Sequence, residues 1–265
     1  MATTAKRTRR KRILMDVPEG TISLGAPSKM PGYAWGLPAG ITCPSAKKSV
    51  KDFGADAVCS GCYVVNLETG KGRGNYRFPA VWAAMVRRMD FVKRSLKEND
   101  GDEAVAVLTD MVRRGCDAEG ENVFRVHDAG DLFHPLYADV WGRVADNLPE
   151  VSFWIPTREW ARDLMLPSLR ELAARPNVTV RPSGLTWEAP APVVEGLSAG
   201  TAVTFDVDGL AEHRTCPATL PGSDGKCGEC RNCWDPGIRV AYLAHGQGAA
   251  KSAKRVGKSL PIHNS

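Results

Sequence analysis

The sequence lacks any long run of apolar residues. No stretch reaches the roughly 18 consecutive apolar residues that a membrane-spanning helix needs, so we expect no membrane span. The basic N-terminus is not followed by the apolar segment of a secretory signal peptide. We therefore expect a cytoplasmic protein in a reducing compartment, where cysteines serve metal binding or catalysis rather than disulfides.

Two common phosphate-binding motifs are also missing. No G-x-G-x-x-G follows a predicted strand, and there is no phosphate-binding loop with its lysine. These absences argue against an open dinucleotide-binding sheet. The chain has 265 residues, of which 43% are hydrophobic and 25% charged, which is enough for one large α/β domain.

Acidic residues are absent from both ends of the chain. Residues 1–12 contain six Lys and Arg, residues 239–265 contain five, and neither stretch contains Asp or Glu. Basic ends favour polyanions, with nucleic acid first, although solvated tails that only aid solubility give the same pattern. We expect a basic disordered arm at 1–13, a single α/β metal-binding domain at 14–240 and a basic tail at 241–265.

The chain does contain eight cysteines, and four of them lie in a C-terminal module at 213–236. They are Cys216, Cys227, Cys230 and Cys233. Four thiolates suit zinc or an iron–sulfur cluster. Zinc sites usually pair two C-x2-C knuckles, whereas consecutive steps of three are typical of ferredoxin loops. The spacing therefore favours a 4Fe–4S cluster, with zinc as the alternative.

A second cysteine group consists of Cys43, Cys59 and Cys62. Three thiolates would leave one iron of a cluster open to a small molecule. The alternative is a zinc knuckle completed by one C-terminal cysteine. Because one zinc or one cubane takes four ligands, we predict two separate sites, one with three cysteines and one with four. Cys116 stands alone and is interpreted as a buried apolar thiol.

Strand and helix patterns alternate through the middle of the chain. Predicted strands lie at 122–126, 151–155, 177–181 and 202–205, and predicted helices at 135–147 and 162–174. Two further helices are predicted from Pro79 and over 102–114. Repeats of this length give parallel strands with crossover helices. We expect a partial TIM-type (β/α) barrel with cysteine-rich metal-binding loops at both ends of the chain.

Polar residues follow three of these strands, where parallel α/β folds place their active sites. His127 and Asp131 follow the first strand, Arg158 the second and Ser183 the third. Asp131 could instead cap the next helix. Arg158 could hold an anion bidentately or form a surface salt bridge.

Together these residues resemble the bacteriophage gene-product-88 family. The resemblance implies a phage protein with cysteine-bound metal in the host cytoplasm, and a host protein is a candidate partner. The segments that carry it run in the family's order: Gly25 to Pro31, Leu37 to Ser45, Cys59 to Tyr63, His127 to Phe133, Trp154 to Arg158, Leu172 to Ser183 and Cys216 to Trp234.

A looser likeness to radical S-adenosylmethionine enzymes rests on Cys59-x2-Cys62-Tyr63 and the strand–helix repeats, without the usual C-x3-C-x2-C spacing. It implies S-adenosylmethionine on the open iron, with Tyr63 and Ser183 as cofactor-binding residues. His127, Asp131 and Arg158 would then line a pocket for a nucleotide or nucleic acid. The alternative is a non-catalytic protein, stapled by zinc or iron–sulfur, that binds nucleic acid or a host protein.

Overall fold

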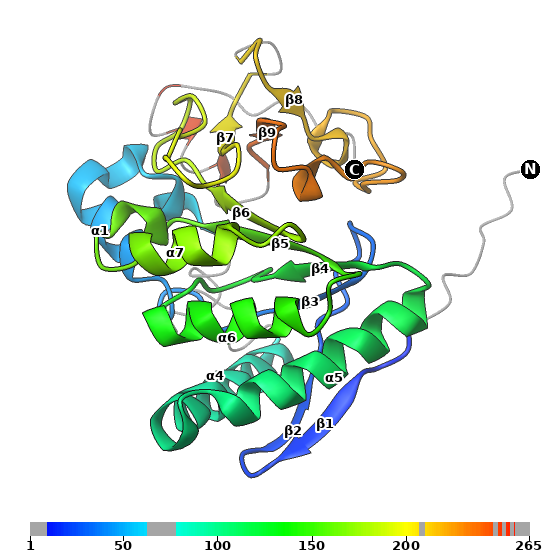
Figure 1. The fold of residues 1–265 in the computed structure, drawn as a ribbon. Helices are drawn as coiled ribbons and strands as arrows, with labels where there is room; N and C mark the ends of the chain where they lie inside the picture. The colour runs from blue at the N-terminus through cyan, green and yellow to red at the C-terminus, as the bar shows by residue number, and fades with distance from the viewer. Residues whose placement is uncertain are drawn as a thin grey trace, which may run out of the picture.

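The computed structural model describes residues 10–62, 78–206 and 210–245, together with 249–250, 253–254 and 257 (Figure 1). Tyr63, most of the basic arm and most of the basic tail lie outside the described residues. Arg10 and Ile13 are described, and both are held by the body. The Arg10 guanidinium donates to the carbonyl of Gly32 over 2.8 Å, and Ile13 is buried.

Four parallel strands form the central sheet, in the order β3-β4-β5-β6. They are β3 (Tyr33–Trp35), β4 (Val123–Val126), β5 (Ser152–Thr157) and β6 (Val178–Pro182). Helix α6 (Pro135–Asp146) connects β4 to β5, and α7 (Leu166–Ala173) connects β5 to β6. The prediction of parallel strands joined by helices is therefore confirmed for this part of the chain.

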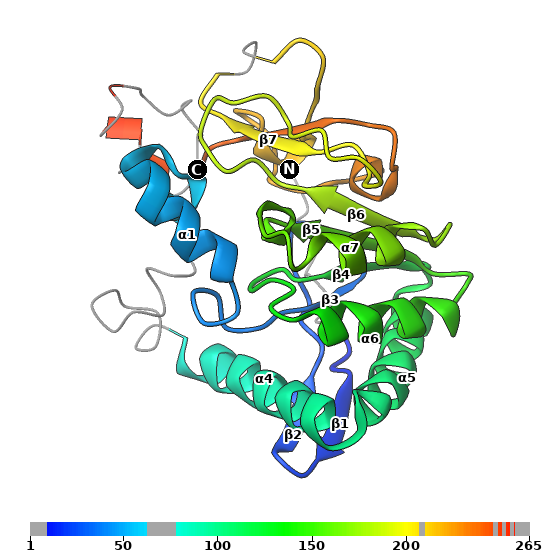
Figure 2. The same cartoon turned by 60° about the vertical axis from the view of Figure 1, so that its left-hand side comes forward.

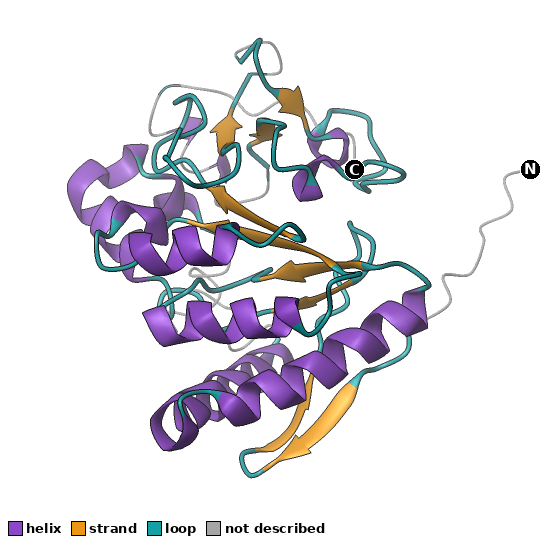
Figure 3. Cartoon of the chain, in the orientation of Figure 1, coloured by secondary structure: helices purple, strands orange, loops and turns teal. Residues whose placement is uncertain are grey.

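One face of this sheet packs against helices. Apolar side chains at alternate strand positions, such as Phe124, Phe153 and Val180, belong to the main core. That core also contains the apolar faces of α4 (Pro79–Asn99), α5 (Asp102–Glu119) and α6. Figure 3 shows α4, α5 and α6 on one side of the sheet and the loops of the C-terminal region on the other.

The opposite face of the sheet carries more polar side chains and is covered by the C-terminal cysteine module. Thr179 donates its hydroxyl to the carbonyl of Trp234 over 2.8 Å. The Trp234 indole donates to the carbonyl of Phe124 over 3.1 Å, and its ring meets that of Trp154 edge to face. Because side chains alternate along a strand, both faces of β4, β5 and β6 are covered.

The predicted TIM-type barrel is wrong. The four-stranded sheet is open, and β7 (Thr201–Thr204), β8 (Arg214–Thr215) and β9 (Val240–Leu243) form a second parallel sheet ordered β7-β9-β8. Within the ranges that the structure describes, the end of β6 pairs with β7 through a single isolated bridge, between Ser183 and Thr201. A barrel needs a helix after each strand, but the Pro- and Gly-containing connection at 183–200 contains none.

The structure also contradicts the prediction that the cysteine-rich loops of that fold are folded as metal sites. Among the described residues, no group of three or more His, Cys, Asp or Glu side chains is arranged to hold a metal ion. The cysteines come from separate turns, since Cys43 precedes α1 (Pro44–Phe53) while Cys59 lies in a 3-10 turn at Val58–Gly61. Among the described residues, these turns therefore form no ready metal site.

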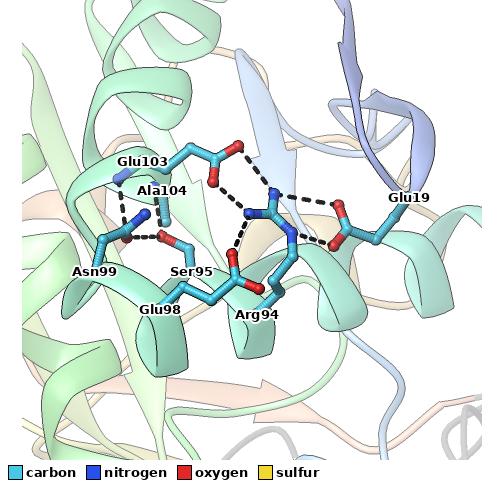
Figure 4. A network of polar contacts seen from close by, with 7 residues as sticks. All are labelled: Glu19, Arg94, Ser95, Glu98, Asn99, Glu103 and Ala104. Carbon is cyan, nitrogen blue, oxygen red and sulfur yellow. Dashed lines mark hydrogen bonds and ion pairs between the residues drawn. The ribbon is translucent and has the colours of Figure 1, made fainter.

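The first strands form a hairpin that Arg94 ties to the helices. Strands β1 (Leu14–Val17) and β2 (Gly20–Ser23) pair antiparallel, with Glu19 in their turn. Figure 4 shows the Arg94 guanidinium of α4 among the carboxylates of Glu19, Glu98 and Glu103. These contacts hold the hairpin against α4 and the first turn of α5.

Across the described parts of the chain, no helix combines the length and apolar character that crossing a membrane requires.

Candidate functional site

The polar residues predicted from the sequence gather at the carboxyl ends of β4, β5 and β6. Helix α1 lies beyond this edge of the sheet (Figure 2). In open α/β sheets, ligands bind in the crevice outside these strand ends. The side chains at this edge are bonded mainly to one another and to the main chain.

Asp131 is the best-anchored carboxylate at this edge. It is 6% exposed and accepts hydrogen bonds from the Thr157 hydroxyl at 2.6 Å and from the main-chain N–H of Arg158 at 2.9 Å. Gly130, with a φ of 82°, makes the turn that returns the chain here. Burial, and then the charge of Glu159, raises the pKa of Asp131 to about 7. His134, not Asp131, caps α6.

Glu159 is a second buried carboxylate, which the sequence analysis missed. It is 0% exposed and accepts hydrogen bonds from the main-chain N–H of Ser45 at 3.0 Å and from the Ser45 hydroxyl at 3.1 Å. Arg162 donates to it over 2.8 Å. Glu159 therefore holds the start of α1 against the end of β5. A lone glutamate after a strand has no periodic signal by which sequence reasoning could find it.

Arg158 and Ser183 take part in contacts between the residues that follow β5 and those that follow β6. The Nε of Arg158 donates to the carbonyl of Gly184 over 2.9 Å, and the Trp160 indole donates to the carbonyl of Ser183 over 2.9 Å. Arg158 is half-buried, and this guanidinium contact is with the main chain rather than with a carboxylate. The two residues lie together at the predicted edge.

His127 points away from this group. Its φ is 67°, and its Nε2 lies 3.1 Å from the Tyr137 hydroxyl of α6. Burial lowers the pKa of His127 to about 3, so its ring is neutral at pH 7. Its Nδ1 has no hydrogen-bond partner among the described residues. Asp131 therefore faces Thr157, while His127 faces the helix layer.

The N-terminal cysteine trio (Cys43, Cys59 and Cys62) lies beside Asp131. Cys43 is buried next to Ala39, and Cys62 packs against this pair. Burial raises the pKa of the Cys43 thiol, and the charge of Asp131 raises it further, ahead of the charges of Cys59 and Cys62. The trio and Asp131 thus share one electrostatic environment at the carboxyl edge of the sheet.

The C-terminal cysteine quartet (Cys216, Cys227, Cys230 and Cys233) lies on the sheet face opposite the helices. Cys233 and Cys227 pack with Met30, Trp154 and Trp234. Burial, followed by the charges of Cys233 and Cys230, raises the pKa of the Cys227 thiol to about 11. Burial also raises the pKa of Cys216, and the charges of Cys227 and Cys230 contribute. The four thiols are therefore electrostatic neighbours.

Arg181 fixes the quartet to the sheet. Its fully buried guanidinium donates to five main-chain carbonyls, those of Ala199, Asn232, Cys233, Asp235 and Ile238. Four of these acceptors belong to the segment that carries the last cysteine. All eight cysteines are free, and Cys116 is buried in α5, as predicted.

Comparison with known proteins places the chain in a phage family. The sequence model of "Gene product 88" matches residues 3–236. The chain is 31% identical over 142 residues to the Gene 88 protein of Mycobacterium phage L5, covering 51% of each chain. It is 29% identical over 130 residues to the Gene 88 protein of Mycobacterium phage D29, covering 46% of each. The chain spans about half the length of these curated relatives.

No solved structure matches the chain. The matched residues include the strand ends with Asp131 and Arg158, the cysteine trio and the whole quartet. The chain belongs to the Gene product 88 family.

Proposed function

We propose that this phage-family protein is an iron–sulfur protein whose C-terminal quartet holds a 4Fe–4S cluster. The observation that carries the proposal is the electrostatic neighbourhood of four thiols, Cys216, Cys227, Cys230 and Cys233, drawn from separate turns. Thiolates are the ligands that such clusters take, so the chemistry of the donor set fits. Binding requires the loop to close, since the described residues form no ready metal site.

The loop between the first two cysteines could close without disturbing the core. Residues 221–224 are exposed, whereas Cys233 is anchored by Arg181. Metal binding would then order the exposed segment against the anchored Cys233, because metal binding and local folding are coupled. The spacing of Cys227, Cys230 and Cys233 favours iron–sulfur over zinc.

The N-terminal trio would hold a second cluster with one open iron. Such an iron takes a small molecule, and S-adenosylmethionine is the candidate, with Tyr63 and Ser183 as cofactor-binding residues. Bound there, this cofactor would supply radical chemistry on a nucleotide or nucleic acid. Asp131 and Arg158 support a substrate site at the same edge, and His127 would need to turn from Tyr137 to join them.

The second candidate function is a non-catalytic binding protein with structural metal. Arg181 favours this second candidate, because its guanidinium donates to five main-chain carbonyls and so serves to hold the loop in place. Zinc or iron–sulfur would then staple that loop while the basic ends bind nucleic acid or a host protein. Deleting residues 1–9, which contain Lys6, Arg7 and Arg9, should flatten the salt dependence of nucleic-acid binding by about 0.9 per lost duplex contact.

Anaerobic purification with iron, sulfide and zinc analysis tests the proposal. We expect iron with matching sulfide and a brown colour in the wild-type protein and in the Cys116→Ala control, whose thiol lies in α5. A colourless protein with zinc and no sulfide supports the second candidate. A folded protein with neither metal contradicts both.

A further inference from the structure

Two arginines lie on the sheet face that the C-terminal cysteine quartet covers, and neither is paired with a carboxylate in a salt bridge. Arg181 in β6 is fully buried, and Arg125 in β4 is half-buried. In the part of the chain that the structure describes, neither forms an ion pair; Arg125 instead donates to the carbonyl of His127 over 3.1 Å and lies 4.4 Å from the centre of the Trp154 ring. Removing a guanidinium from water without a counter-charge is costly, so these cations call for an anion nearby.

Cysteine thiols are among the groups near these arginines that can become anionic, together with Tyr242 and Asp235 beside Arg181. An Nη of Arg181 lies 3.3 Å from the carbonyl oxygen of Cys233, and the Cys233 sulfur lies 3.0 Å from the Tyr242 hydroxyl. The Trp154 ring under Arg125 packs in one cluster with Cys233 and Cys227.

The charges match those of a four-thiolate metal centre. Four thiolates around a zinc ion, or around an oxidised cubane with a doubly positive core, keep two negative charges. The two positive charges of Arg125 and Arg181, which form no salt bridge, would balance the two negative charges of the centre. The Tyr242 hydroxyl can donate a hydrogen bond to the thiolate of Cys233. Outer groups of this kind orient the ligands and tune the metal.

We propose that Arg125, Arg181 and Tyr242 are positioning residues that select and stabilise a doubly negative four-thiolate centre in the quartet. This inference rests on the proposed function, since it needs a metal there. Arg181 also clamps five carbonyls, so its removal would disturb the loop itself. Arg125 and Tyr242 are therefore the informative positions.

The test measures how firmly the purified full chain keeps its metal. Anaerobic wild-type protein, Arg125→Gln, Arg125→Lys and Tyr242→Phe are titrated with a chelator, and release is followed by metal analysis and by the thiolate-to-metal absorption. We expect Arg125→Gln and Tyr242→Phe to weaken retention about 10- to 100-fold. Arg125→Lys keeps the charge and should restore most of it. Arg239→Gln, which removes a surface arginine paired with Glu212, should behave as wild type.

The reduction potential gives a second readout that packing alone would not move. If iron is present, a dithionite titration should show lower midpoint potentials in Arg125→Gln and Tyr242→Phe, because reduction adds a negative charge that these groups stabilise. Retention and potential unchanged in both variants would overturn the inference while leaving the proposed function intact. Wild-type protein without any metal would instead refute the proposed function, and the inference with it.

Discussion

Glu159 and Ser45 are joined by two hydrogen bonds across 114 residues of sequence, from the main-chain N–H and the hydroxyl of Ser45. Both residues are buried. The contact fixes the first turn of α1, and with it Cys43, against the end of β5. The position of the N-terminal cysteine trio therefore depends on a carboxylate that carries no metal-binding signature.

Ser45→Ala should lower the free energy of unfolding by about 1–3 kcal/mol, because it removes one donor from a fully buried carboxylate. Urea denaturation measures the change. Ser49→Ala is the matched control on the same helix, since the Ser49 hydroxyl donates to the carbonyl of Ala46 one turn earlier. Equal losses in the two variants would show that the Glu159 contact contributes nothing of its own.

Asp131 should make the protein less stable as pH rises. Its folded-state pKa is raised to about 7, above the unfolded value of about 4. The folded state therefore binds the proton more tightly, and this stabilisation is present at low pH and lost as pH rises through about 7. Asp131→Asn should flatten the stability curve between about pH 4 and 7. The exposed control Asp110→Asn should leave that slope unchanged, and a wild-type slope retained in Asp131→Asn would contradict the account.

Arg181→Met should destabilise the chain by about 3 kcal/mol or more, because five buried carbonyls lose their donor. We expect limited proteolysis to cut first near residues 221–229, where the loop is already largely exposed. Arg239→Met, at the edge of the same region, should cost little. Protease resistance equal to that of wild type would mean that Trp234 and Thr179 hold the module without Arg181.

Arg94→Met should loosen the N-terminal hairpin without unfolding the sheet. The guanidinium contacts Glu19 at 2.5 Å and Glu103 at 2.6 Å, so its loss removes these ties between the hairpin turn and α4 and between α4 and α5. Hydrogen exchange of the β1 and β2 amides measures this opening. Lys48→Met, which breaks an exposed pair with Asp52 within α1, should leave the same amides protected. Faster exchange throughout the sheet in Arg94→Met would show a global rather than a local effect.

The sequence predicts the middle of this fold well because β4, β5 and β6 are short apolar runs separated by amphipathic helices. It does not predict how the sheet ends. A barrel and an open sheet share the same strand–helix alternation, and only the irregular connection after Ser183 and the two-residue strand β8 separate them.

The candidate site also contains residues whose positions the sequence predicts and residues whose positions it does not. Asp131, Arg158 and Ser183 lie at the predicted edge because parallel strands end together. His127 does not join them, since its left-handed backbone directs the ring to Tyr137. The roles of Arg125 and Arg181 cannot be predicted from the sequence, because an arginine in a strand does not reveal which residues it contacts. Those contacts depend on how residues 230–238 fold back over the sheet.

Metal analysis of two cysteine variants tests the central claim most directly. Anaerobically purified Cys230→Ala and Cys59→Ala are compared with wild type for iron, sulfide and zinc, and circular dichroism confirms that each variant is folded. We predict that Cys230→Ala loses the metal of the quartet and keeps that of the trio, and that Cys59→Ala does the reverse. Loss of all metal from either folded variant, or no change in metal content in both, would contradict the assignment of two separate cysteine sites.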